Sequence, residues 1–244
     1  MSGAGSRAGT GVLAGARTGG VRALVAAVIG AFLLVEALLL GLGLLITRVL
    51  DGGPVEREEL DFENAVLDRR TPTWDTVSSW GTVLGSTSTV VALTAAGCLV
   101  LALRRHGPRL PLFLALAVIG ETLLFLLAAA LLDRVRPPIP QLDVAPPTSS
   151  FPSGHTAASV SMWVGLALGL SRTRPGHRLR ALFWSLAVAV PLFVLLSRLY
   201  RGMHWPTDVL ASTVFALVWL LLLRAVLLPR GDRAEPSGVP ALGK

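Results

Sequence analysis

The stretch SRLYRGMHWPTD, residues 197–208, stands between two long apolar runs of the chain. It holds two arginines, a histidine and an aspartate, whereas the flanking runs, residues 182–196 and 209–228, contain a single charged side chain, Arg224. A helix needs about 20 apolar residues to cross the hydrocarbon core of a bilayer. The two runs are therefore predicted membrane-spanning helices, and the charged stretch joins them at one membrane surface.

Four further apolar runs cover residues 24–46, 82–103, 110–132 and 156–170. Only 15% of the chain is charged and 52% is hydrophobic, whereas about a quarter of a soluble domain is charged. The run 24–46 is too long for a cleaved signal peptide, whose apolar part has about 7–15 residues. The prediction is an all-α polytopic membrane protein with six transmembrane helices. One membrane domain, residues 22–229, lies between disordered cytoplasmic tails, residues 1–21 and 230–244.

The basic residues predict the orientation. With the N-terminus in the cytoplasm, cytoplasmic segments carry 14 of the 22 basic residues and outer segments carry 11 of the 15 acidic ones. This bias matches the positive-inside rule. The prediction is a multi-pass protein of the cell membrane with both termini cytoplasmic. Most arginines stand at the ends of apolar runs, which indicates contact with lipid headgroups and no nucleic-acid partner.

The first outer loop, residues 48–79, is more ambiguous. Leu60, Phe62, Val66 and Leu67 are spaced loosely for a short helix that lies at the membrane interface. A solvated acidic connector fits the same residues equally well.

Three polar segments fall on the outer face under this topology: DRVRPP (133–138), SSFPSGHT (149–156) and the opening stretch. Arg134, Arg136, Arg198 and Arg201 lie in them. Guanidinium groups are planar donors suited to paired hydrogen bonds with phosphate oxygens. The convergence of these segments predicts a phosphate-binding site.

The segment SSFPSGHT precedes an apolar helix, so that Ser153 is placed as its N-cap. The free amides of Gly154 and His155 at that helix end would form an anion site. His204 and Asp208 are four residues apart, with Pro206 as first residue of the last span. At this spacing the carboxylate can accept a hydrogen bond from the imidazole and raise its basicity, as a nucleophilic histidine requires. His155 then remains as the general acid.

A metal site built from His155, His204 and a carboxylate is the competing interpretation. No HxH or HxxxH pair occurs in the sequence, and arginines nearby would repel a cation. We therefore predict no metal ion and no other cofactor.

At these residues the chain resembles the type-2 phosphatidic acid phosphatase (PAP2) superfamily, membrane-bound lipid phosphatase branch. Its Pro–Ser–Gly–His motif is intact at residues 152–155, and its Ser–Arg–x5–His–x3–Asp motif is intact at residues 197–208. Its Lys–x6–Arg–Pro motif is partial, because Arg136 and Pro137 match but Ala129 stands in the lysine slot. The resemblance covers about residues 60–225.

The resemblance implies a PAP2-like helical bundle and a metal-independent phosphatase. His204 would form a phosphohistidine, Asp208 would orient it, and His155 would protonate the leaving group. The phosphate oxygens would be held by a cradle of four residues: Arg136, Ser153, Gly154 and Arg198. The implied substrates are lipid phosphates in the bilayer: phosphatidic acid, phosphatidylglycerol phosphate or a polyprenyl (di)phosphate such as undecaprenyl diphosphate. For Ala129 two outcomes stay open: Arg134 compensates for the lysine, or the lost charge slows turnover or changes the phosphate preferred.

Other interpretations remain. Ala129 would also fit a catalytically silent membrane protein that binds phospholipid or scaffolds a partner. A transporter fits less well, since the charges cluster on one face, and the six spans argue against the soluble branches of the superfamily. Glu36 and Glu121 stand in the middle of predicted spans, where we favour a role in helix contacts over a role in a lipid path.

Overall fold

The computed structural model describes residues 8–50 and 52–228, with side chains from Gly20 onward. Within these residues every regular element is a helix. The predictions for the chain ends, residues 1–7 and 229–244, lie outside the described part. Helix α1 begins at Ala8, so residues 8–21, predicted to belong to a disordered tail, are helical.

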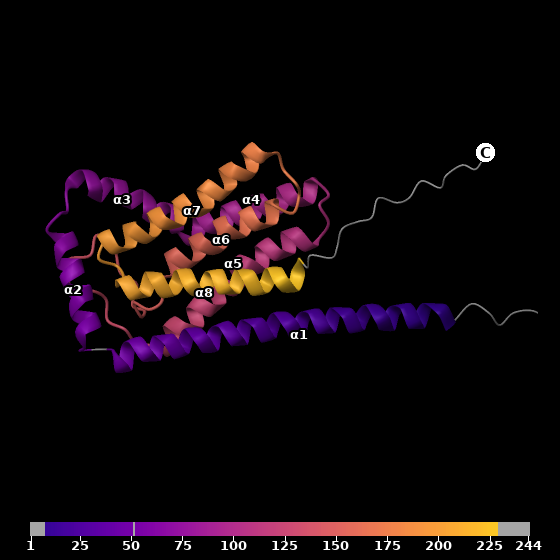
Figure 1. Ribbon diagram of the computed structural model, residues 1–244, viewed down its shortest axis with the longest axis horizontal. Coiled ribbons are helices and arrows are strands. Elements are labelled where there is room, and N and C mark those ends of the chain that lie inside the picture. Colours follow the sequence, from indigo (N-terminus) through magenta and orange to yellow (C-terminus); the bar gives the residue numbers. More distant parts are fainter. Residues whose placement is uncertain (1–7, 51, 229–244) are drawn as a thin grey trace, which may run out of the picture.

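Among the described residues, the longest helices run side by side along the molecule (Figure 1). Their bounds agree with the six predicted spans to within five residues, except at the start of α1. They are α1 (Ala8–Leu44, continued by a π-helical turn, Leu45–Val49), α4 (Thr87–Leu103), α5 (Arg109–Leu131), α6 (Gly154–Leu170), α7 (His177–Tyr200) and α8 (Pro206–Leu227).

The number of membrane crossings is confirmed only in part. Among the described residues, α1, α5, α7 and α8 are long and apolar enough to cross a bilayer, and α3 (Pro72–Gly85) with α4 forms a bent fifth candidate. Helix α6 has 17 residues, or about 25 Å at about 1.5 Å per residue, which is less than the hydrocarbon core of about 30 Å. The sixth crossing stays a prediction.

The first outer loop contains two helices, α2 (Pro54–Leu67) and α3, and α2 lies across one end of the bundle (Figure 1). Each begins with proline, which suits the first helical turn, and the Thr71 hydroxyl accepts from Trp74 N–H at 3.3 Å. The prediction of one span over 82–103 is wrong at its start, because Ser86 ends α3 and caps α4, and the two axes differ by 49°.

The short helix that was one of the two alternatives for this loop is present as α2. Its buried residues are Glu59 and Glu63, whereas Phe62 is 41% exposed. Neither interpretation of this loop predicted buried carboxylates. They are buried because α2 packs over the polar end of the bundle, where Glu59 pairs with Arg134 and accepts from the Thr207 N–H.

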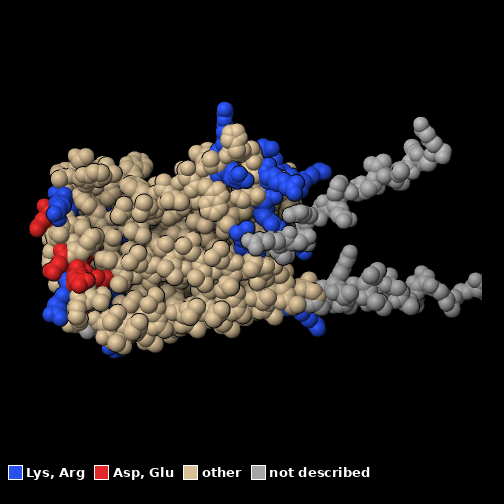
Figure 2. All heavy atoms as spheres, viewed as in Figure 1, with Lys and Arg blue, Asp and Glu red and all other residues tan. Residues whose placement is uncertain are grey.

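The core is built around α6, which contacts α3, α4, α5, α7 and α8. On the face shown in Figure 2, charged side chains gather toward the two ends of the molecule and leave a band without Lys, Arg, Asp or Glu between them. On the face shown, acidic residues lie only at the end that holds α2, and the opposite end is basic. The polar segments of the site therefore meet at the end that carries the acidic side chains.

Candidate active site

A cavity of about 450 Å³ lies at the end of the bundle that α2 covers. It is lined by both histidines of the motifs and by two of the four arginines: His155, His204, Arg136 and Arg198. These residues come from three segments far apart in the sequence, as the topology predicted. Of the other predicted site residues, Gly154 lines this cavity, and Ser153 and Asp208 lie behind its wall, fully buried.

The loop between α7 and α8 places His204. Gly202 has φ +68°, which side-chain-bearing residues rarely adopt. A Cβ there would also come within about 3.0 Å of Arg70 Nη2 and of the Ile139 side chain. The Met203 N–H donates to the Arg198 carbonyl at 3.0 Å and closes the end of α7. The chain therefore reverses within a few residues and turns the imidazole toward the cavity.

The tautomer of His204 follows from its neighbours. Its Nδ1 lies 2.7 Å from the carbonyl oxygen of Ser150, which can only accept a hydrogen bond. Nδ1 therefore carries the proton, and Nε2 has a free lone pair. Burial lowers the pKa of this imidazole, against the opposing effect of Asp208. The ring is thus held neutral with Nε2 available as a nucleophile.

Asp208 does not hold His204 in the way predicted. Its Oδ2 is 3.7 Å from Nδ1, beyond hydrogen-bond distance. Instead the carboxylate accepts from the Ser150 hydroxyl, from Trp205 N–H at 3.0 Å and from Arg134. Asp208 ties the chain before α6 to the start of α8, and its charge remains close enough to stabilise a positively charged imidazole.

Helix α6 starts at Gly154 with Ser153 at the N-cap position. The Ser153 hydroxyl bonds the Thr156 hydroxyl at 3.0 Å, and the Ser153 N–H donates to Ser212 Oγ at 2.7 Å. The backbone N–H of Ser153 therefore connects the start of α6 to α8, while its hydroxyl bonds within the first turn of α6 and does not line the cavity. At Gly154 an added Cβ would come within about 3.0 Å of the Phe125 ring, so glycine allows α5 to approach the start of α6.

Two arginines face the cavity. Arg136 donates through Nη1 to the Met203 carbonyl at 2.6 Å, which directs the rest of its guanidinium toward His204. Arg198 is 1% exposed and donates through Nη2 to Asp143 at 2.8 Å and to the Thr82 hydroxyl. Cationic donors next to a neutral histidine form a site for an anion.

Asp143 was not predicted, and it shares its carboxylate between Arg198 and Arg201. Burial alone would raise its pKa, but the hydrogen bonds and charges of the two arginines bring it down to about 2. It is thus an anion at neutral pH. It is the only acidic residue between Asp133 and Asp208 in the sequence. That isolation was the one available signal that it partners an arginine.

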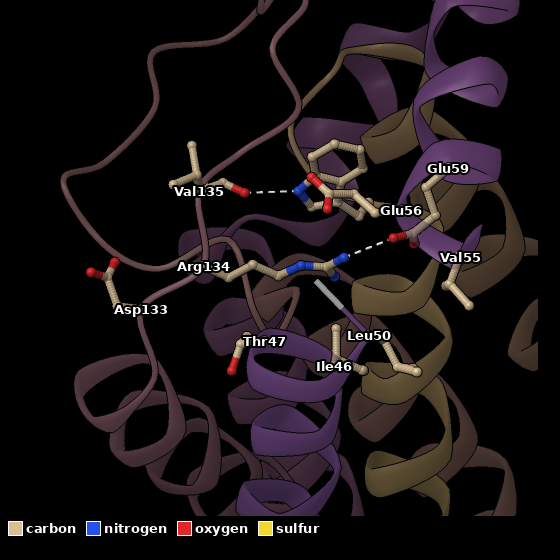
Figure 3. A pocket seen from close by; sticks show the side chains of 10 residues that line it. Ile46, Thr47, Leu50, Val55, Glu56, Glu59, Asp133, Arg134 and Val135 are labelled. Carbon is tan, nitrogen blue, oxygen red and sulfur yellow. Dashed lines mark hydrogen bonds and ion pairs between the residues drawn. The ribbon is translucent and has the colours of Figure 1, made fainter. Parts of the chain in front are cut away.

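Arg134 and Arg201, the other two arginines of the predicted phosphate-binding segments, do not line the cavity. Arg201 donates to the Asp75 carbonyl at 2.9 Å and to the Leu142 carbonyl at 2.8 Å, which fastens α7 to α3 and the loop. Arg134 points toward Glu59 of α2, with Nη2 2.7 Å from that carboxylate (Figure 3).

Arg134 lines a second cavity, of about 310 Å³, beside α2 (Figure 3). Glu59 also accepts from the N–H and hydroxyl of Thr207, each at 2.7 Å. Glu59, Arg134 and Asp208 form a chain of ion pairs from α2 to the start of α8. Nothing in the sequence pattern pointed to Glu59, because its partners lie 75 and 148 residues away.

Ala129 lies one turn beyond Phe125 on α5, and Phe125 and Leu126 both line the main cavity. Residues four apart share a helix face, so position 129 is next to the cavity rim. Arg134 does not replace the missing lysine, because it bonds to Asp208 and Glu59 behind the site. Within the described part of the chain, no group of three or more His, Cys, Asp and Glu could hold a metal ion.

The fold and the site define a polytopic helical membrane protein with an anion cradle at one end of the bundle. The chain belongs to the PAP2 superfamily, whose profile matches residues 112–232. A solved structure, titled as a transmembrane PAP2 type phosphatidylglycerolphosphate phosphatase from Bacillus subtilis, has the same fold. It aligns with a TM-score of 0.69 and 24% identity over 78% of this chain and 94% of that one.

Among curated proteins, phosphatidylglycerophosphatase B of Haemophilus influenzae is 38% identical over 73 residues. The aligned segment spans 30% of this chain and 29% of that relative. It therefore supports the family and leaves activity and substrate to be inferred from the site.

Proposed function

We propose that this protein is an integral membrane phosphatase that removes a terminal phosphate from a phospholipid of the phosphatidylglycerophosphate kind. The observation that carries the proposal is the hydrogen bond from His204 Nδ1 to the Ser150 carbonyl. It leaves the Nε2 lone pair free in a cavity that also contains Arg136, Arg198 and His155. The names of the two similar proteins favour this lipid over phosphatidic acid and polyprenyl diphosphate.

In the first step Nε2 of His204 attacks phosphorus, and the bond from phosphorus to the lipid oxygen breaks. His155, which takes up a proton as the anionic phosphate binds, gives that proton to the oxygen, which leaves as an alcohol. The phosphohistidine ring is then cationic, with Nδ1–H still donating to Ser150. Asp208, 3.7 Å from Nδ1, stabilises this charge.

In the second step His155 accepts a proton from water, and the resulting oxygen attacks phosphorus. The P–N bond breaks, its electron pair returns to Nε2, and inorganic phosphate leaves. Arg136 and Arg198, with the amides at the start of α6, stabilise the charge on the phosphoryl oxygens in both steps. Because Arg198 already bonds Asp143, the phosphate takes the remaining face of its guanidinium.

The test is phosphate release by the detergent-purified protein with EDTA throughout. Phosphatidylglycerophosphate, phosphatidic acid and polyprenyl mono- and diphosphate form the panel. We expect release from the first lipid to exceed the others and to fall at least about a thousandfold in His204→Ala. His177→Ala is the matched control, because His177 is exposed at the opposite end of the bundle. Full activity in His204→Ala, or complete loss with EDTA, contradicts the mechanism.

A second function rests on two observations. Ala129 removes a cation from the cradle, and Asp143 occupies one side of Arg198. A protein that binds lipid phosphate without hydrolysing it would show both. Saturable binding of the lipid by folded protein, with no phosphate released, supports this alternative.

A further inference from the structure

Glu121 is a buried carboxyl group in the wall of the main cavity. It stands on α5, is 1% exposed, and its Oε2 has no hydrogen-bond partner within the described part of the chain. A buried polar atom without a partner is destabilising, because burial removes the water that would otherwise hydrogen bond to it. Such an atom in a cavity wall is a donor or acceptor that a bound molecule can satisfy.

Below the histidines and arginines the cavity becomes apolar. Val90 of α4, Val118 of α5 and Ala158 of α6 line this part. Val91 and Leu126 also line it and are 56% and 53% exposed, so the cavity opens sideways between α4 and α5. In a membrane-spanning bundle a sideways opening faces lipid, and a lipid substrate would extend from the cradle past Glu121 to that opening.

The position of Glu121 on α5 gives its depth below the cradle. The Phe125 ring packs against Gly154, at the level of the cradle. Glu121 precedes Phe125 by four residues on the same helix face, and at about 1.5 Å per residue it lies about 6 Å deeper. In a glycerol phosphate the oxygen on carbon 2 is four bonds from phosphorus, or about 5 Å. A hydrogen bond of about 2.8 Å then reaches the Glu121 carboxyl.

We propose that Glu121 selects lipids whose phosphate is carried by glycerol, by hydrogen bonding the oxygen on carbon 2; this rests on the proposed function. In phosphatidylglycerophosphate that oxygen is the free hydroxyl of the terminal glycerol, and in phosphatidic acid it is acylated. A polyprenyl phosphate has only hydrocarbon at this distance and leaves the buried carboxyl unpaired. A site that is built to bond a substrate hydroxyl rejects an analogue that lacks it.

The experiment compares phosphatidylglycerophosphate with an analogue whose terminal glycerol is replaced by 1,3-propanediol, which lacks only the carbon-2 hydroxyl. We expect wild-type kcat/KM to be at least about tenfold higher for the natural lipid. Glu121→Leu should bring that ratio near one, and Glu121→Gln should keep it, because an amide still forms hydrogen bonds. Glu36→Leu, which removes a buried unpartnered carboxyl of α1 outside the cavity, should leave the ratio unchanged.

A wild-type ratio near one, or an unchanged ratio in Glu121→Leu, overturns the proposal. Phosphatidic acid tests the acylated oxygen separately from the free hydroxyl. If Glu121→Leu hydrolyses phosphatidic acid more slowly than the wild type does, Glu121 also contacts the acylated oxygen on carbon 2. Binding of the same lipids is followed in parallel by tryptophan fluorescence. If the wild type releases no phosphate from any lipid, the proposed phosphatase function fails, and the ratio of binding constants still decides the role of Glu121.

Discussion

His204 keeps its proton on Nδ1 because the Ser150 carbonyl lies 2.7 Å away. The sequence motif correctly predicts that His204 and Asp208 lie near each other, because they are only four residues apart. It does not specify which oxygen reaches the imidazole. That depends on the path of the backbone before α6, and a backbone carbonyl is present at every position, so no residue type marks it.

Ala129 is the single departure from the family's motifs, and its effect can be tested at the same scale. We expect Ala129→Lys to lower KM for the lipid phosphate by about threefold to tenfold, because a further cation near the rim attracts a dianionic phosphate. Inhibition by inorganic phosphate should strengthen by a similar factor. The KM measured with Ala129→Leu separates charge from size.

If the leucine and lysine variants behave alike, the effect comes from filling the rim. If neither variant changes KM, position 129 is out of reach of the phosphate in this chain, and the lysine slot has lost its role.

Three of the four predicted cradle residues, Arg136, Gly154 and Arg198, line one cavity with His155 and His204, whereas Ser153 does not line it. Their residue types and order in the motifs were the signal, because arginines and free amides at a helix start suit a phosphate group. The partners of Arg134 and Arg201 were not predictable in this way. An arginine that binds phosphate and an arginine that binds a carboxylate look the same in a sequence.

At the scale of helices, the apolar runs placed α5, α6, α7 and α8 to within a few residues, because a long hydrophobic run leaves little choice of structure in a bilayer. The same reasoning failed for the segment between α1 and α4. There the apolar pattern is weak. The residues of α2 that become buried are those that face the polar end of the bundle, onto which α2 packs. Glu59 and Glu63 of α2 are buried there as a result.

Glu63 gives α2 a pH-dependent stability. Both of its oxygens lack a hydrogen-bond partner among the described residues, and burial raises its pKa from 4.5 to about 8, although Arg70 lowers it somewhat. Between those values the unfolded chain has lost the proton that the folded protein keeps. The unfolded state therefore binds fewer protons, and stability falls as pH rises from about 4.5 to about 8.

We expect Glu63→Gln to flatten this slope, because a neutral amide replaces the neutral acid. At pH 9 the melting temperature of the variant in detergent should exceed that of the wild type by roughly 5 °C, and at pH 5 the two should agree. Glu58→Gln on the exposed face of α2 is the control and should follow the wild type. If the melting temperatures of Glu63→Gln and the wild type change equally with pH, Glu63 keeps no proton in the folded state.

On the scale of the whole molecule, the charge distribution predicts an orientation. The starts of α1, α5 and α7 and the end of α8 lie at one end of the bundle, and the face shown there is basic (Figures 1 and 2). The cavity and the acidic helix α2 lie at the other end. The positive-inside rule then places the basic end in the cytoplasm and the cradle on the outer side.

Cysteine labelling tests that orientation directly. Cys98, which donates to the Pro111 carbonyl at 3.4 Å, is first replaced by serine to remove the native thiol. Gln141→Cys then marks the loop beside the cavity, and His106→Cys marks the basic turn between α4 and α5; both positions are exposed. We expect a membrane-impermeant maleimide to label Gln141→Cys on intact cells and His106→Cys only after permeabilisation.

The reverse pattern would place the cradle in the cytoplasm, where the lipid phosphate would have to be hydrolysed on the inner leaflet. The sideways opening between α4 and α5 would then face inner-leaflet lipid, and the basic end would face outward against the positive-inside rule. A lipid that is phosphorylated on the cytoplasmic side would then need no crossing of the bilayer before hydrolysis. Labelling as expected requires such a crossing before hydrolysis, so the orientation decides whether lipid translocation precedes this reaction.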